Sequence, residues 1–408
     1  MIRPFQVYLD SSDFSVLSDP SRRTQEIITL ENQLISWRNA GLIEMRFAYS
    51  HLIEAAPIEP KYTEVFRCRT QKIAELCQGK ALAAQDKIFR AEIRALSGEP
   101  VKNGYIFMDD GDWLPELSDD LADLTELLDP AQFKREVEAK GLGRTETRKQ
   151  LNQFITRNGE LRPVAKRFLK QKLPEIVAAL CQQYPVDKEE VLKLCHSILN
   201  GTSRESARGV LYNSFINLPN FAEWFVRQFD QVNPAVAWLR KTGDLTRSGI
   251  LESRKILDNL LVSQAESGIS NDVILAMAQE AVESLIERLP KTILPELAEQ
   301  CGCPVPPTMA LRELPGKAPS LFTSFSVWGG IMRKTLKPFE NERNPKISDM
   351  GDVLHSHYLP HVDFFRTDGF AASVIQEIKL PFNTTIVGNL LQLPDAITKK
   401  RLAEKGAS

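Results

Sequence analysis

The strand-forming segments of this chain are confined to its two ends. Near the N-terminus, residues 4–10 and 42–49 are apolar, β-prone runs on either side of a segment with helical spacing, residues 22–39. Near the C-terminus, further strand patterns cover residues 362–368 and 384–387. A strand, a helix and a strand in succession are typical of a parallel unit. The sequence therefore predicts an α/β domain with a parallel sheet to which both chain ends contribute.

The long segment between these ends is of a different type. From about residue 59 to 319, strand patterns nearly vanish and segments with helical apolar spacing follow one another, separated by Pro and Gly. We expect a discontinuous α/β domain of residues 1–57 and 320–408, and an all-α insertion of residues 58–319. The proline-rich residues 301–319 are interpreted as a linker that closes the insertion.

Local signals predict several helix ends. Ser50 is expected to cap a short helix that carries Glu54, and Ser348 to cap another that Pro360 ends. Further helices are predicted at residues 320–337 and 370–378, followed by a C-terminal tail from Leu390 to Pro394.

Composition excludes some classes of partner. The formal charge is -2 over 408 residues, so any polyanion site must be local rather than a field of the whole molecule. The six cysteines are scattered without the density of a disulfide scaffold, which favours a reducing, cytoplasmic location. The sequence shows no signal-peptide pattern and no apolar run of membrane-spanning length, so no membrane partner is expected.

Two adjacent blocks of opposite charge lie in the predicted insertion. Residues 105–130 hold nine acids and no Lys or Arg, whereas residues 131–172 hold twelve Lys or Arg against four acids. The basic block is the kind of patch that neutralises phosphates. It is equally well explained as a solvated helix face or as a partner for the acidic block.

Four acids are predicted to meet at one edge of the sheet. Asp10 and Asp368 follow strands, and Glu54 and Asp352 belong to short helices, so all four are expected near the carboxyl ends of the strands. Clustered carboxylates repel one another and either take up protons or hold divalent cations. Hard oxygen ligands of this kind suit Mg²⁺ or Mn²⁺ rather than zinc.

These segments resemble those of PIN-domain and PIN-like nucleases. The resemblance is carried by Val7-Tyr8-Leu9-Asp10-Ser11-Ser12, Ser50-His51-Leu52-Ile53-Glu54, Asp352-Val353-Leu354-His355 with Tyr358-Leu359-Pro360, and Phe364-Phe365-Arg366-Thr367-Asp368. It covers about the first 57 and the last 70 residues, and the central 260 or so residues have no counterpart in the smaller family members. The resemblance implies a parallel sheet sandwiched by helices, in which these four acids bind Mg²⁺ or Mn²⁺ to cut RNA or, in some branches, DNA.

Other polar residues receive two interpretations each. Asp13 and Asp349 can act as auxiliary ligands, but turn and cap roles are favoured, and Asp363 is interpreted as structural. Ser50 and Thr367 can orient a carboxylate or phosphate, or serve as caps.

Histidines and basic residues near the acids also have two interpretations. His355 is assigned a supporting role, because His355, His357 and His361 lack the companions of a tetrahedral zinc site. Arg333, Lys334 and Lys337 are candidates for binding phosphate, or form a solvated helix end.

The expected function is that of a metal-dependent endonuclease in which Asp10, Glu54, Asp352 and Asp368 hold the metal. RNA is the favoured substrate and DNA the alternative, with substrate or protein-partner selection by the insertion. Two other functions fit the residues: a non-catalytic scaffold that binds nucleic acid or a partner, and a phosphatase of small phosphoesters. A toxin, a defence effector and an RNA-processing enzyme are all compatible with this sequence, which leaves the oligomeric state open.

Overall fold

The strands of this chain form one four-stranded parallel sheet. A computed structural model describes residues 3–57, 59–100, 104–115, 162–183, 186–199, 215–227, 229–336 and 343–406. Strands β1 (Phe5–Tyr8), β2 (Ile43–Arg46), β3 (Phe364–Arg366) and β4 (Thr385–Val387) lie in the order β2-β1-β3-β4, and every neighbouring pair is parallel. The predicted α/β class, with a parallel sheet built from both chain ends, is confirmed.

The register of the sheet joins the two ends of the chain directly. Tyr8 of β1 is paired with Arg46 of β2 on one side and with Phe365 of β3 on the other. All four residues of β1 and all three of β3 are buried. Parallel strands that are covered on both faces have nearly continuous apolar runs in their sequence. This explains why both segments could be recognised as strands from sequence.

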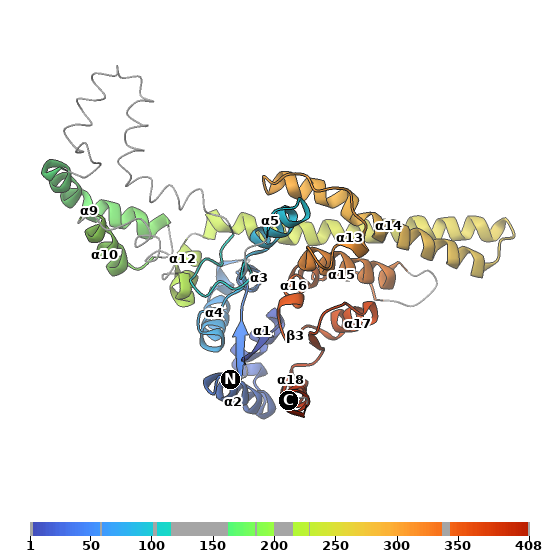
Figure 1. The fold of residues 1–408 in the computed structure, drawn as a ribbon, viewed down its shortest axis with the longest axis horizontal. Coiled ribbons are helices and arrows are strands. Elements are labelled where there is room, and N and C mark those ends of the chain that lie inside the picture. The colour runs from blue at the N-terminus through green and yellow to red at the C-terminus, as the bar shows by residue number, and fades with distance from the viewer. Residues whose placement is uncertain are drawn as a thin grey trace, which may run out of the picture. The chain divides into compact units, whose positions relative to one another are not determined.

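Helices make up most of the remaining described chain. The helices described in the part of the chain that contains the sheet are α1 (Ser11–Ser18), α2 (Gln25–Asn39), α3 (Tyr49–Ala55), α4 (Thr63–Cys77), α5 (Gln85–Leu96), α13 (Phe229–Glu266), α14 (Asn271–Gln300), α15 (Pro319–Thr335), α16 (Asp349–Ser356), α17 (Gly369–Ile378) and α18 (Leu393–Gly406). Short 3₁₀ turns are η1 (Pro20–Arg22), η2 (Pro60–Tyr62), η3 (Leu311–Glu313), η4 (Leu359–His361) and η5 (Leu390–Gln392). In Figure 1 the first helices (blue) and α18 (dark red) lie at the same end of the sheet, where α2 and α18 are in contact.

The chain divides into two compact units. The first comprises residues 1–108 and 230–408 and contains the sheet, and the second comprises residues 109–229. These limits differ from the expected domains, because residues 59–108 and 230–319 belong to the unit that holds the sheet. The assignment of residues 58–319 to one inserted domain stays a prediction.

The centre of the first unit is built around α15. This helix contacts α16, α17, α14 and α5, and twelve of its residues are buried. Its glycines allow close packing, since a Cβ atom at Gly330 would lie 2.5 Å from Cγ1 of Val374 on α17. The buried residues Tyr8, Val327, Tyr358 and Phe365 belong to one apolar cluster that joins α15 to the sheet. Burial of such side chains stabilises the fold by roughly 2 kcal/mol each.

Several local predictions near the C-terminus were wrong. Residues after Leu390 form η5 and the helix α18 rather than a tail, because proline is compatible with the first turn of a helix and Pro394 lies there. α16 ends at Ser356, and Pro360 lies in the separate turn η4.

One prediction for the chain before α15 also differs from the structure. The proline-rich segment is not a free linker, because Leu311, Leu314 and Ala318 are buried in an apolar cluster with residues of α5 and α14. As expected, no strand is found in the described residues between 59 and 319, where the β pairing consists of two isolated bridges, Phe47 with Ala81 and Leu82 with Phe107.

The second unit has an apolar core of its own. Helices α9 (Pro163–Gln183), α10 (Lys188–Leu199) and α12 (Leu218–Arg227) are described there. The ring of Phe221 lies 5.4 Å from that of Trp113, and the Trp113 indole N–H donates to the Phe215 carbonyl. The acidic and basic blocks of the sequence fall largely outside the described residues. None of the described helices has the length and apolar character needed to cross a membrane.

Candidate active site

The parallel register brings two of the predicted acids to one edge of the sheet. β1 ends at Tyr8 and β3 at Arg366, so Asp10 and Asp368 both follow by two residues the carboxyl ends of neighbouring strands. This edge is where open α/β sheets bind their ligands. Each acid also begins a helix: Asp10 accepts from the Ser12 amide at the start of α1, and Asp368 from the Ala371 amide at the start of α17.

Asp352 lies in the first turn of α16, as predicted, and its environment is strongly negative. Its carboxylate has no hydrogen-bond or ion-pair partner among the described residues. Burial raises the pKa of Asp352 well above its ordinary value, and the charges of Asp368 and Asp10 raise it further. Three aspartates from separate parts of the chain therefore share one electrostatic neighbourhood.

Glu54, the fourth predicted acid, is engaged by a histidine. Its Oε2 lies 3.0 Å from Nε2 of His355 on α16, although the two residues are 301 positions apart. Burial raises the pKa of Glu54, but the His355 charge and hydrogen bond lower it to about 2. Burial lowers the pKa of His355, but Glu54 raises it to about 9. The two shifts agree on a glutamate–imidazolium ion pair.

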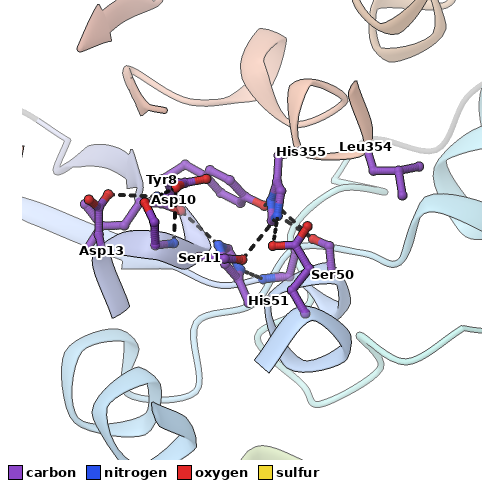
Figure 2. Close-up of polar contacts among 12 residues, drawn as sticks. Tyr8, Asp10, Ser11, Asp13, Ser50, His51, Leu354 and His355 are labelled. Atoms are coloured by element: carbon purple, nitrogen blue, oxygen red, sulfur yellow. Dashed lines mark hydrogen bonds and ion pairs between the residues drawn. The ribbon is translucent and has the colours of Figure 1, made fainter. Parts of the chain in front are cut away.

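Both ring nitrogens of His355 have hydrogen-bond partners. Its Nδ1 lies 2.5 Å from the Tyr8 hydroxyl, and its Nε2 lies 3.2 Å from the Ser11 hydroxyl (Figure 2). Because the ring is protonated, Nδ1–H donates to Tyr8 and Nε2–H is directed to Glu54 and Ser11. Ser50 Oγ lies farther away, at 3.4 Å from Nδ1. The contacts of His355 link β1, α1, α3 and α16, and its supporting role in the site stays a prediction.

A second histidine, His51, was not singled out from the sequence. Its Nδ1 accepts from the Ala48 amide, so its Nε2 carries the proton and donates to the Leu9 carbonyl. Burial lowers the pKa of His51 to about 3, and the His355 charge acts in the same direction. His51 is therefore neutral, and it joins the start of α3 to the end of β1 (Figure 2). The contacts of His51 could not be predicted from the sequence, because a single histidine in a short helix belongs to no periodic pattern.

The helix that carries Glu54 begins differently from the prediction. α3 starts at Tyr49, and Ser50 lies inside it rather than at its N-cap, where Ala48 stands. His51 instead accepts from the amide of the N-cap residue Ala48. Gly351 of α16 allows the close approach, since a Cβ atom there would collide with the Glu54 carboxylate.

The auxiliary acids make local contacts. Asp13 accepts from the Asp10 amide and forms a buried ion pair of 2.7 Å with Arg366. Burial raises the pKa of Asp13 to about 7 although Arg366 opposes this shift. Asp349 accepts from Arg343 and from the Lys346 amide.

Two further residues at the strand ends have structural contacts. The Asp363 carboxylate accepts from Arg3 and the Gln6 amide, in agreement with its structural interpretation. Thr367 is buried, and its amide donates to the Val387 carbonyl.

The basic residues predicted to bind phosphate are engaged elsewhere or lie outside the described chain. Arg333 forms two hydrogen bonds with Glu283, and Lys334 contacts Glu377 and the Ser373 hydroxyl. Lys337 is outside the described residues.

The three histidines near residue 360 have separate environments. His357 Nδ1 lies 2.8 Å from the Leu354 carbonyl oxygen, and its ring packs 4.6 Å from that of Phe89. His361 contacts the Ser320 hydroxyl. They do not converge with His355 on a common point.

The described part of the chain contains no preformed metal-binding site. Nowhere in it are three or more His, Cys, Asp or Glu side chains arranged so that they could hold a metal ion. The donor chemistry nevertheless suits a hard cation, because an unpartnered Asp352 carboxylate lies within the fields of Asp10 and Asp368. The charges of Asp10 and Asp368 thus act on Asp352, and the role of these residues as metal ligands stays a prediction.

Comparison of this chain with protein-family models, with curated proteins and with solved structures gives no match.

Proposed function

We propose that this protein is a Mg²⁺- or Mn²⁺-dependent phosphodiesterase of PIN-like type that cleaves nucleic acid, with RNA as the favoured substrate. One observation supports it above the others: the half-buried Asp352 carboxylate has no partner among the described residues, and its pKa is raised by the charges of Asp368 and Asp10, which follow the carboxyl ends of neighbouring parallel strands. The helix dipole favours a carboxylate in the first turn of α16, but burial and the charges of Asp368 and Asp10 disfavour the ionised form of Asp352. Its retention there is explained by a cation that it would bind.

The proposal gives each acid a task. Asp10, Asp352 and Asp368 would hold the cation, and Glu54, positioned by His355, would complete the acidic side of the site. A bound divalent cation lowers the pKa of a water molecule and offsets the negative charge that develops on the phosphoryl oxygens. The His355 imidazolium keeps Glu54 ionised and fixes its orientation from α16.

The test is cleavage of a labelled oligoribonucleotide with Mn²⁺. We expect Asp352→Asn to reduce cleavage by at least about 100-fold, because it removes a negative ligand while keeping the side-chain volume. The matched control is Asp395→Asn, an exposed aspartate in the first turn of α18, which should cleave like the wild type. Circular dichroism verifies the fold. Equal residual cleavage by the wild type and Asp352→Asn would exclude this site as the source of activity.

A second candidate, a non-catalytic scaffold, is favoured by a different observation. Glu54 is neutralised by His355, and the carboxylates of Asp10 and Asp368 cap helices, so three of the four acids already have structural partners. Titration calorimetry with Mn²⁺ separates the two functions. A nuclease should bind Mn²⁺, and Asp352→Asn should remove this binding. A scaffold should bind Mn²⁺ no more tightly than the Asp352→Asn variant does.

A further inference from the structure

Two arginines converge on one hydroxyl beside the acids. Arg69 of α4 donates from Nη2 to the Ser15 hydroxyl at 3.0 Å, and Arg22 of η1 donates from Nη1 to the same oxygen at 3.4 Å. Neither guanidinium forms a salt bridge with a carboxylate of the described chain. In addition, Arg69 Nε is buried without a hydrogen-bond partner among the described residues. We refer to Arg22 and Arg69 as the arginine pair.

The position of the arginine pair connects it to the candidate active site. Ser15 and Ser11 lie four residues apart on α1, so they share one helix face at a separation of about 6 Å. Ser11 contacts His355, and His355 contacts Glu54. α1, α3 and α4 pack against one another. The arginine pair therefore lies about one helical turn along α1 from the acids.

The electrostatics of the arginine pair favour an anion. Burial lowers the pKa of Arg69, the Glu54 charge opposes this shift, and the Arg22 charge adds to it. Two like charges that approach a single neutral hydroxyl repel each other, and Asp19, the acid that interacts with Arg22, is already hydrogen-bonded to the Ser21 amide and hydroxyl. A phosphate group relieves such repulsion, because guanidinium groups bind phosphate oxygens through charge-assisted, often bidentate, hydrogen bonds.

Ser15 and both arginines remain accessible enough for a ligand. Arg22 is exposed, and Ser15 and Arg69 are half-buried. Arg333 and Lys334, two of the basic residues considered from sequence, have carboxylate partners instead.

We propose that Arg22, Arg69 and the Ser15 hydroxyl form a binding site for a backbone phosphate of the nucleic acid, one that neighbours the bond to be cleaved. This inference rests on the proposed function, because it assigns the substrate contact of the same site. A contact to a phosphate does not depend on the base or the sugar. The arginine pair should therefore bind a backbone phosphate of RNA and of DNA equally well. Discrimination between the two, if present, comes from other residues.

The test measures binding without cleavage. The full-length protein is titrated, in EDTA and at several salt concentrations, into a fluorescein-labelled single-stranded oligoribonucleotide whose anisotropy is recorded. We expect Arg22→Gln and Arg69→Gln each to weaken binding about tenfold. Each should also reduce the slope of log K against log salt by about 0.7, the value for one phosphate contact with a single strand.

Two variants serve as controls for this measurement. Arg67→Gln removes a positive charge from the same helix, but Arg67 contacts Glu64, so binding should be unchanged. Arg69→Lys keeps the charge and loses the planar fork, so it should retain the salt slope while weakening binding. This second variant keeps the test decisive if Arg69→Gln fails to fold, as monitored by circular dichroism.

The outcomes separate this inference from the proposed function. If Arg22→Gln and Arg69→Gln bind like the wild type, or if Arg67→Gln loses as much affinity, the phosphate site is wrong whether or not the protein cleaves RNA. If the wild type shows no salt-dependent binding, it is wrong as well. If binding follows the arginine pair but Mn²⁺ yields no cleavage, the phosphate site stands and the nuclease function fails.

Discussion

At the scale of single residues, His355 makes the contacts that connect the C-terminal segment to the N-terminal one. This one imidazolium contacts Tyr8, Ser11 and Glu54, which come from three different elements of the N-terminal segment. A buried charge is tolerated only when it is paired and hydrogen-bonded. The contacts of His355 therefore join the two ends of the chain energetically as well as spatially.

Tyr8→Phe tests this arrangement. The ring of Tyr8 stacks on Phe365 and Tyr358, and phenylalanine retains these contacts, but the His355 Nδ1–H loses its close acceptor. We expect the free energy of unfolding to fall by about 2 kcal/mol, the cost of leaving a buried donor of a charged group unsatisfied. Urea denaturation measures it.

Tyr358→Phe is the matched control for this prediction. The Tyr358 hydroxyl donates to the uncharged Ala83 carbonyl at 3.0 Å, so its removal should cost less, about 1 kcal/mol. A loss for Tyr8→Phe no greater than that for Tyr358→Phe would show that His355 does not depend on the Tyr8 hydroxyl.

At the scale of elements, α5 and α15 are joined by a buried carboxylate. Glu92 of α5 accepts from the amides of Ser320 and Leu321 at 2.9 Å each, and from the Tyr105 hydroxyl at 3.2 Å. These amides belong to the first turn of α15 and have no partner within the helix. A residue 228 positions away in sequence thus caps the central helix of the first unit.

The pKa of Glu92 makes this connection sensitive to pH. Burial raises this pKa from 4.5 to about 7, although the amide hydrogen bonds oppose the shift. Because the folded-state pKa exceeds the unfolded-state value, the contribution of Glu92 to stability is complete below pH 4.5 and is lost as pH rises through about 7.

Glu92→Gln is expected to remove this pH dependence. Between these two pH values, the wild type should lose about 3 kcal/mol of unfolding free energy relative to the variant, whose side chain does not titrate. Denaturation of both proteins across this range provides the measurement. Parallel pH profiles would contradict the assignment.

At the scale of the whole molecule, the chain forms two compact units with separate apolar cores. The aromatic cluster of Trp113, Phe221 and Phe225 lies in residues 109–229, whereas the cluster around Tyr8 and Phe365 lies in the other unit. Separate cores allow the units to lose structure separately.

Phe221→Ala tests their independence. Phe221 is 1% exposed, and its truncation should destabilise residues 109–229 by about 3–5 kcal/mol. Hydrogen exchange followed by mass spectrometry should show faster exchange in peptides of α10 and α12, with unchanged protection in β1 and β3. Loss of protection in the strands as well would show that the units unfold together.

The sequence by itself determined the class of fold and the neighbourhood of the acids. Strand runs buried on both faces have a local signature, and acids that follow such runs reach the carboxyl edge of a parallel sheet, as Asp10 and Asp368 do. Capping was less predictable: Ser50 lies inside α3, and the N-cap residue is Ala48, whose amide donates to His51.

Only the tertiary structure decided which charges meet. The pairing of Glu54 with His355 and the convergence of Arg22 and Arg69 on Ser15 join residues from different elements. Periodicity reports which face of its own element a residue occupies, but it does not report which side chain lies opposite. The electrostatic partners of this site therefore depend on the packing of α1, α3, α4 and α16, which no local pattern encodes.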